Sequence, residues 1–235
     1  MNSENPLFEN LTLSQLSLAN RAVVAPMTRV STKGDGVPTD LMVQYYQRYA
    51  AGGFGLIITE GTYTDRQFSQ SYPNQTGITN EEQKTGWRNV VQAVHDAGGK
   101  IFLQLMHGGA LSQHLSNTRA PSSIQPMRHM LEGYSQKQGV FPLPQAMTLA
   151  EIDDVIQGFV NSARRAEEAG FDGVEIHGAN GYLLDQFLTS YTNNREDQYG
   201  GSLENRCRLA ADILKAIKKA VSKTCTVGIR LSQGK

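Results

Sequence analysis

The chain has 235 residues, of which 39% are hydrophobic and 19% are charged, and its 22 basic residues balance its 22 acidic residues. This composition predicts a folded core and gives no basic surface field for nucleic acid, and no apolar run is long enough to span a membrane. Because the polar N-terminus does not resemble a signal peptide and Cys207 and Cys225 lack metal-ligand spacing, we expect a cytoplasmic protein without a metal site.

The sequence contains several short apolar segments that predict β-strands. Residues 7–20 carry leucines at alternating positions, which predicts a hairpin covering the floor of the fold. Five apolar runs follow, each ending in a polar residue, at 22–26, 56–60, 101–105, 173–177 and 226–230. Such runs are typical of parallel strands that are buried on both faces.

Amphipathic helices are expected between these strands, near residues 80–97, 148–169 and 202–222. Capping boxes predict the start of the first at Thr79 with Glu82 and of the second at Thr148 with Glu151. Apolar residues spaced by four and three predict the buried stripe of the third helix: Leu203, Cys207, Ala210, Leu214, Ile217 and Val221. Glycines at 52–53, 98–99 and 170 are expected to end helices just before strands.

The predicted β/α repeats are compatible with two α/β folds, a doubly wound sheet and a (β/α)₈ TIM barrel. No GxGxxG follows the first strand, which disfavours a dinucleotide-binding doubly wound sheet. Polar residues recur where strands end: Thr28, Glu60, Gln104, His177 and Arg230. Because a barrel gathers its active site at the C-terminal ends of its strands, we predict a TIM barrel. The long segments 106–147 and 178–201 lie at that end and are expected to be functional loops, the first a candidate lid.

One predicted turn contains three residues that are able to take part in catalysis. His177 ends a strand, and Asn180 and Tyr182 follow within a glycine-spaced turn. Two hydrogen-bond donors and a phenol at this spacing suit a site that binds an oxygen atom and delivers a proton. A structural turn, in which Asn180 serves the backbone and Tyr182 packs, explains the same spacing, and both interpretations stay open on spacing alone.

The segment 177–188 and its continuation through 194–206 resemble the signature of the Old Yellow Enzyme family of FMN ene-reductases. The resemblance extends to residues 25–29, 60–62, 104–105 and 119–122. It implies an FMN-dependent oxidoreductase that uses NADH or NADPH to reduce the activated C=C bond of small α,β-unsaturated carbonyl compounds. It fixes neither the physiological substrate nor the choice of nicotinamide.

The resemblance also implies roles for individual residues. The flavin-binding set is Pro26, Met27, Thr28, Gly61, Gln104 and Arg230. Thr28 is expected near the O4/N5 edge, and Arg230 beside N1/O2, where a cation favours the reduced anionic flavin. His177 and Asn180 are expected to hold the substrate carbonyl oxygen; some relatives have a second histidine in place of the asparagine. Tyr182, a phenol with an ordinary pKa of about 10, is expected to protonate Cα while flavin N5 gives hydride to Cβ.

Two further polar residues have competing interpretations. His107, at the end of the third strand, is expected to hold its loop by a hydrogen bond rather than to act in the site. Glu60 is expected to be a structural carboxylate rather than a general base. Met106 stands where some family members have tryptophan, which predicts a more pliable pocket wall.

The strand count qualifies the barrel prediction. Five strands are expected, whereas a barrel closes with eight and usually takes its phosphate site from the loops after strands 7 and 8. We therefore expect residues 1–235 to form a single incomplete TIM-barrel domain, with strands 6–8 absent through truncation. The alternative is a non-catalytic half-barrel that needs a partner or the missing C-terminal part. Whether copies of the chain form a homo-oligomer is left open.

Overall fold

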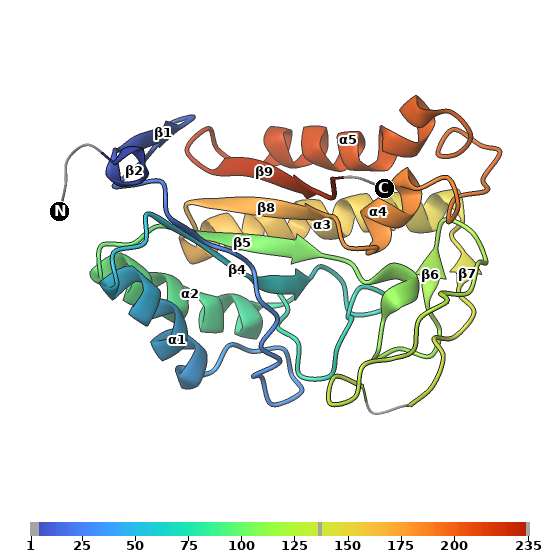
Figure 1. The fold of residues 1–235 in the computed structure, drawn as a ribbon, viewed down its shortest axis with the longest axis horizontal. Coiled ribbons are helices and arrows are strands. Elements are labelled where there is room, and N and C mark those ends of the chain that lie inside the picture. The colour runs from blue at the N-terminus through green and yellow to red at the C-terminus, as the bar shows by residue number, and fades with distance from the viewer. Residues whose placement is uncertain (1–4, 136–137, 234–235) are drawn as a thin grey trace.

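A five-stranded parallel sheet forms the centre of the protein, seen in a computed structural model that describes residues 5–135 and 138–233 (Figure 1). Its strands are β3 (Val23–Val24), β4 (Leu56–Tyr63), β5 (Ile101–Met106), β8 (Gly173–Gly178) and β9 (Thr226–Leu231). They pair in the order of the chain, β3-β4-β5-β8-β9. A doubly wound sheet reverses its strand order at a switch point, whereas a barrel wall does not. The order therefore supports the barrel over the doubly wound sheet.

The long helices cover the sheet in the same sequence. They are α1 (Asp40–Ala51), α2 (Glu81–Asp96), α3 (Leu149–Ala169) and α5 (Leu203–Ala220). Each contacts the next, α1 with α2, α2 with α3 and α3 with α5, as in the outer ring of a barrel. The glycine stops are confirmed, since Gly53, Gly98 and Gly170 have φ of +84°, +80° and +97°. No helix within the described ranges is long and apolar enough to cross a membrane.

The two predicted capping boxes had different outcomes. The box at the start of α3 is confirmed, because Glu151 N donates to Thr148 Oγ1 at 3.2 Å and Thr148 N donates to Glu151 Oε2 at 2.9 Å. The box at α2 is wrong, because Asn80 Oδ1 instead accepts from Gln83 N at 2.9 Å. Asparagine is at least as good a cap as threonine, so the helix begins one residue later than expected.

The predicted stripe of α5 is partly wrong. Leu203 is 62% exposed, whereas Leu209, Ile213 and Ile217 are fully buried. These three residues form the row that lies in the main core, and of them only Ile217 was predicted. The predicted residues Cys207, Ala210 and Leu214 instead line a groove beside the short helix α4 (Leu183–Leu188) and β9.

The hairpin prediction is confirmed. Strands β1 (Leu11–Leu13) and β2 (Leu16–Leu18) pair antiparallel after a short 3₁₀ turn at Pro6–Phe8. Leu18 is fully buried and packs with Leu56, Ile58 and Phe102 at the start of the sheet strands. Figure 1 shows the hairpin at the end opposite the strand arrowheads, where it covers the floor of the fold.

The two long segments lie at the arrowhead end and contain more regular structure than expected (Figure 1). The first includes a 3₁₀ turn at Gly109–Leu111 and is closed by the parallel pair of β6 (Arg119–Ala120) with β7 (Gln145–Ala146). The second includes the short helix α4 (Leu183–Leu188), whose buried face packs against β8. These elements fix the two segments around the end of the sheet where the predicted site residues lie.

Candidate active site

A cavity of about 160 Å³ opens at the C-terminal ends of the strands, and the predicted site residues gather around it. Its lining consists of Ala25, Pro26, Thr28, Gly61, Gln104, Met106, His177, Asn180, Tyr182 and Arg230. Met27 is the exception among the predicted residues. Its side chain is 42% exposed and does not line the cavity. The turn at 177–182 therefore faces the same space as the predicted flavin-binding residues.

His177 is the last polar residue of β8 and is only 5% exposed. Its Nδ1 accepts a hydrogen bond from Ala179 N at 3.3 Å, so the network assigns the proton of the neutral ring to Nε2. Burial, with a smaller contribution from nearby Arg230, lowers the pKa of His177 to about 4. At neutral pH the ring is thus an uncharged N–H donor at the cavity wall.

The turn after His177 is fixed by its backbone. Asn180 has φ +60°, a left-handed conformation that asparagine tolerates better than most residues. Asn180 N donates to Ser232 Oγ at 3.0 Å, and Gly181 N donates to Asp185 Oδ2 at 2.7 Å. These bonds tie the turn both to α4 and to the segment after β9, and they hold Asn180 at the cavity.

Tyr182 stands at the N-terminus of α4, with its ring edge-on to that of His177 at a centroid separation of 5.0 Å. Burial raises the pKa of the Tyr182 phenol well above its ordinary value. Tyr182 therefore keeps its proton through the neutral range. A protonated phenol next to a neutral imidazole gives this wall two uncharged donors.

Glu175 binds two residues that line the cavity, Gln104 and Arg230, and was not predicted from the sequence. Its Oε1 accepts from Gln104 Nε2 at 2.7 Å and from Arg230 Nε at 2.9 Å, and its Oε2 accepts from Arg230 Nη2 at 3.1 Å. The signal was available, because Glu175 interrupts an apolar strand two residues before His177 and so lies on the same face. One carboxylate on β8 thus orients both predicted flavin-binding side chains.

Comparison with known proteins identifies the family. The model described as "NADH:flavin oxidoreductase / NADH oxidase family" matches residues 6–235. The chain belongs to this family. It is 45% identical to "Flavin oxidoreductase hxnT" of Emericella nidulans over 97% of this chain and 59% of the relative. It is 42% identical to the "Probable flavin mononucleotide-dependent alkene reductase" of Leishmania infantum over 92% of this chain and 60% of the relative.

Solved structures agree with this assignment. The Old Yellow Enzyme homologue of Zymomonas mobilis has a TM-score of 0.88 and 36% identity, covering 97% of this chain and 63% of that one. Morphinone reductase in complex with tetrahydroNAD has a TM-score of 0.87 and 38% identity, covering 97% and 64%. The predicted Old Yellow Enzyme resemblance is confirmed, and the sheet and its helices are part of a TIM barrel. The chain spans about 60% of the length of the two curated relatives named above.

FMN with a nicotinamide reductant is the cofactor set of the family, and the residues of this chain fit a flavin ring. A Cβ at Gly61 would collide with the sulfur of Met106, so the backbone itself forms that part of the wall. Gln75 Nε2 holds the wall by donating to Gly61 O at 2.7 Å. The amide of Gln104 and the cation of Arg230 supply donors at one end of the cavity, as an electron-rich pyrimidine edge requires.

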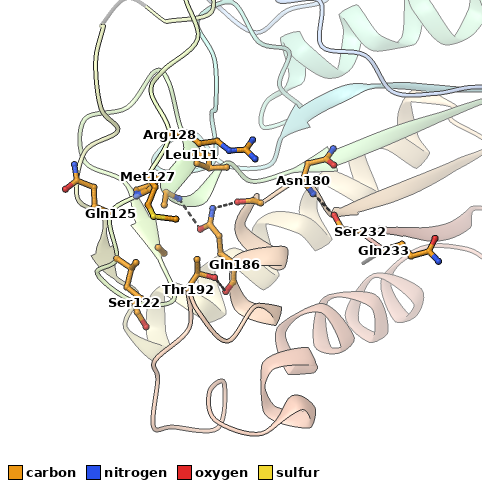
Figure 2. Close-up of a pocket in the computed structure, with 15 residues that line it drawn as sticks. Leu111, Ser122, Gln125, Met127, Arg128, Asn180, Gln186, Thr192, Ser232 and Gln233 are labelled. Atoms are coloured by element: carbon orange, nitrogen blue, oxygen red, sulfur yellow. Dashed lines mark hydrogen bonds between the residues drawn. The ribbon is translucent and has the colours of Figure 1, made fainter. Parts of the chain in front are cut away.

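A larger cavity of about 620 Å³ adjoins the first, and Asn180 lines both. Figure 2 shows Leu111, Met127 and Arg128 of the first long segment facing Asn180 and Ser232. Gln186 joins the two long segments, because its Oε1 accepts from Ala110 N at 3.1 Å and its Nε2 donates to Gly108 O at 3.3 Å. Asn180 is thus the junction between the predicted reaction site and a roomier, partly apolar space.

Glu60 and His107 lie behind these walls. Glu60 Oε2 accepts from Arg29 N at 3.1 Å and lines neither cavity, which favours the structural interpretation. Burial raises its pKa to about 7. His107 Nδ1 accepts from Gly109 N at 3.1 Å, so its predicted loop-holding hydrogen bond is confirmed. Burial lowers the pKa of His107 as well.

Proposed function

We propose that this chain carries the substrate- and flavin-facing part of an FMN-dependent NAD(P)H oxidoreductase that reduces the activated C=C bond of α,β-unsaturated carbonyl compounds. The observation that carries the proposal is the shared cavity. Neutral donors on His177, Asn180 and Tyr182 face the same space as Gln104 and Arg230. Relatives named as an alkene reductase and as 12-oxophytodienoate reductases support the same reaction class.

His177 and Asn180 bind the carbonyl oxygen in this proposal. The Nε2–H of neutral His177 and the amide of Asn180 donate to the oxygen, where negative charge develops as the alkene is reduced. Because the low pKa of His177 keeps its ring neutral, the pair polarises the carbonyl without giving it a full proton. Asn180 also borders the larger cavity, which is suited to receive the unreacting part of the substrate.

Gln104 and Arg230 hold the flavin, with Thr28 and Gly61 along its ring and Pro26 beside it. When bound, the flavin supplies the hydride that adds to the β-carbon. Arg230 places a cation beside the ring and favours its reduced, anionic state. Tyr182 completes the reduction by giving its proton to the α-carbon. The reductant is NADH or NADPH.

Replacing Tyr182 by phenylalanine tests the reaction. The Tyr182→Phe enzyme loaded with FMN is expected to reduce cyclohexenone at least about 100-fold more slowly, since a general acid contributes on the order of 10² to 10⁴ in rate. Reduction of its flavin by NADPH or NADH is expected to stay near the wild-type rate. Tyr191→Phe is the matched control, because Tyr191 is 60% exposed and lines neither cavity.

Two results would contradict this function. One is a Tyr182→Phe enzyme that reduces the enone at the wild-type rate, which removes Tyr182 as the acid. The other is a protein that takes up no FMN under any loading condition, which removes the flavin chemistry altogether.

The alternative is a non-catalytic half-barrel, a single incomplete domain of residues 1–235 that is stable only with a partner. The observation that favours it is strand β9, none of whose residues is buried. Size measurement and flavin titration of the 235-residue chain separate the two proposals. A monodisperse monomer that binds FMN stoichiometrically excludes the half-barrel, whereas an assembly without flavin supports it.

A further inference from the structure

We propose that Tyr72 is a positioning residue for Tyr182: its hydroxyl donates to the Tyr182 hydroxyl, leaves the Tyr182 proton free to face the cavity, and stabilises the phenolate that remains after proton transfer. The inference deepens the proposed function and rests on it. Tyr72 lies in the segment after β4, far from Tyr182 in sequence, and it belonged to none of the motifs that pointed to the site.

The two phenols are in direct contact. The hydroxyl oxygens of Tyr72 and Tyr182 are 2.5 Å apart, within the range of a short O–H···O hydrogen bond. Tyr72 is only 7% exposed. Because a hydroxyl has a single proton, one phenol donates in this bond and the other accepts. If Tyr72 donates, the proton of Tyr182 remains available to another acceptor.

The backbone of Tyr72 is fixed by the same residue that holds the flavin-facing wall. Gln75 Oε1 accepts from Tyr72 N at 3.3 Å and from Ser71 N at 2.6 Å, while Gln75 Nε2 donates to Gly61 O at 2.7 Å. The Tyr72 carbonyl accepts from Gln70 Nε2 at 2.9 Å. One amide side chain thus sets Tyr72 relative to Gly61.

The ring of Tyr72 is held from the other side. It packs edge-on against Tyr134 with a centroid separation of 5.7 Å. The ring of Tyr182 packs in the same manner against His177 at 5.0 Å. With both rings held, the hydroxyl of Tyr72 offers a preset partner and loses little freedom when the reaction begins.

Proton transfer explains why such a partner is useful. The O–H bond of Tyr182 breaks, a C–H bond forms at the α-carbon of the substrate enolate, and the electron pair of the broken bond stays on the Tyr182 oxygen. Solvent water then returns a proton to that oxygen. A buried phenolate is disfavoured by desolvation, and a hydrogen bond donated to the charged form offsets part of this cost. Tyr72 is positioned to make that bond.

The central test is Tyr72→Phe in the flavin-loaded enzyme. We expect the rate of flavin reoxidation by cyclohexenone to fall about tenfold, the scale for losing a hydrogen bond to a charged group. The solvent deuterium isotope effect on that step is expected to rise, because proton transfer becomes more rate-limiting. Flavin reduction by NAD(P)H and the KM for the enone are expected to stay unchanged. Tyr134→Phe is the matched control, since it removes a hydroxyl from the same aromatic cluster but leaves the Tyr72–Tyr182 bond intact.

A purely structural role for Tyr72 gives a different pattern. It predicts that Tyr72→Phe changes KM, flavin affinity or flavin reduction, with no change in the isotope effect, and this pattern overturns the proposal. A variant with 3-fluorotyrosine at position 72 keeps the hydroxyl and makes it a stronger donor. It is expected to work at the wild-type rate or faster, and a tenfold loss in this variant also overturns the proposal.

The double variant separates this inference from the proposed function. Adding Tyr72→Phe to Tyr182→Phe is expected to cause no further loss of rate, because the two hydroxyls act as a unit. If Tyr182→Phe alone has no effect, the proposed function fails. If Tyr182→Phe slows the reaction and Tyr72→Phe does not, only the role of Tyr72 fails. A readout without flavin is a downfield hydroxyl-proton NMR signal that both single variants should lack.

Discussion

Strands β8 and β9 are neighbours with similar sequences and very different surroundings. They pair in parallel with Ile176 beside Ile229 and His177 beside Arg230. Every residue of β8 is buried, whereas none of β9 is. Among the described residues β8 has a partner strand on each side and β9 has one, so burial here follows the number of neighbouring strands and not the apolar character of the strand itself. The proposed site straddles this boundary, with His177 and Glu175 on the buried strand and Arg230 on the open one.

The largest expected effect is a difference in stability between the two strands. Ile176→Ala is expected to lower the free energy of unfolding by about 2–5 kcal/mol, because the side chain is fully buried and leaves a cavity. Ile229→Ala, its register partner, is expected to cost less than half as much, because its side chain is only partly buried. Urea unfolding of both variants gives the comparison. Equal losses would mean that β9 is as enclosed as β8 in solution.

The second prediction concerns how the stability of the protein depends on pH through two buried groups, Glu60 and His177. Burial raises the pKa of Glu60 on β4 from 4.5 to about 7, so its stability contribution falls as pH rises from 4.5 to 7. Burial lowers the pKa of His177 on β8 from 6.5 to about 4, so its contribution falls as pH drops from 6.5 to 4. Each shift corresponds to on the order of 3 kcal/mol, and the two oppose each other where their ranges overlap.

Single replacements should separate these opposing trends. Relative to the wild type, Glu60→Gln is expected to become more stable as pH rises from 4.5 to 7. His177→Asn is expected to become relatively more stable as pH drops from 6.5 to 4. Urea midpoints measured at a series of pH values test both variants. Parallel pH profiles for wild type and Glu60→Gln would show that Glu60 is ionised normally and hence better hydrated than its buried position indicates.

The smallest expected effect concerns the link across the boundary. Glu175→Gln removes the charge that binds Arg230 through two hydrogen bonds, so Arg230 is expected to become mobile at the open strand. We expect FMN to bind about tenfold more weakly, the scale of one charge-assisted hydrogen bond. Fluorescence titration with FMN measures the change. Glu9→Gln, which breaks the exposed pair with Arg21, is the control and should leave affinity unaltered; equal affinity in Glu175→Gln would leave Arg230 fixed by other contacts.

Patterns confined to neighbouring residues predicted the fold well. The five strands, the hairpin, the capping box at Thr148 and the glycine helix stops all follow from local periodicity and turn chemistry. The start of α2 was misplaced because Thr79 and Asn80 are both good caps, and only the folded chain selects between them. The stripe of α5 was misassigned because that helix has two apolar rows, and the packing of α3 decides which is buried.

In the site, too, local sequence patterns were predicted and contacts between distant residues were not. The turn from His177 to Tyr182 is continuous in sequence and was found there. Glu175 and Tyr72 act through partners on other strands or loops, Gln104, Arg230 and Tyr182, so their contacts exist only after folding. The sequence alone therefore pointed to the proposed reacting groups but not to the residues proposed to orient them.

The left-handed backbone at Asn180 also limits how this site can diversify. At φ +60° a branched or bulky side chain is strained before it meets any ligand, whereas asparagine, aspartate, histidine and glycine are tolerated. Mutational libraries at this position are therefore filtered first by backbone geometry and only afterwards by catalysis. Most of the twenty amino acids should be disfavoured at this position for reasons unrelated to the substrate. The tolerated residues are three with polar side chains and glycine. Of these residues, asparagine and histidine can donate a side-chain hydrogen bond to a carbonyl oxygen.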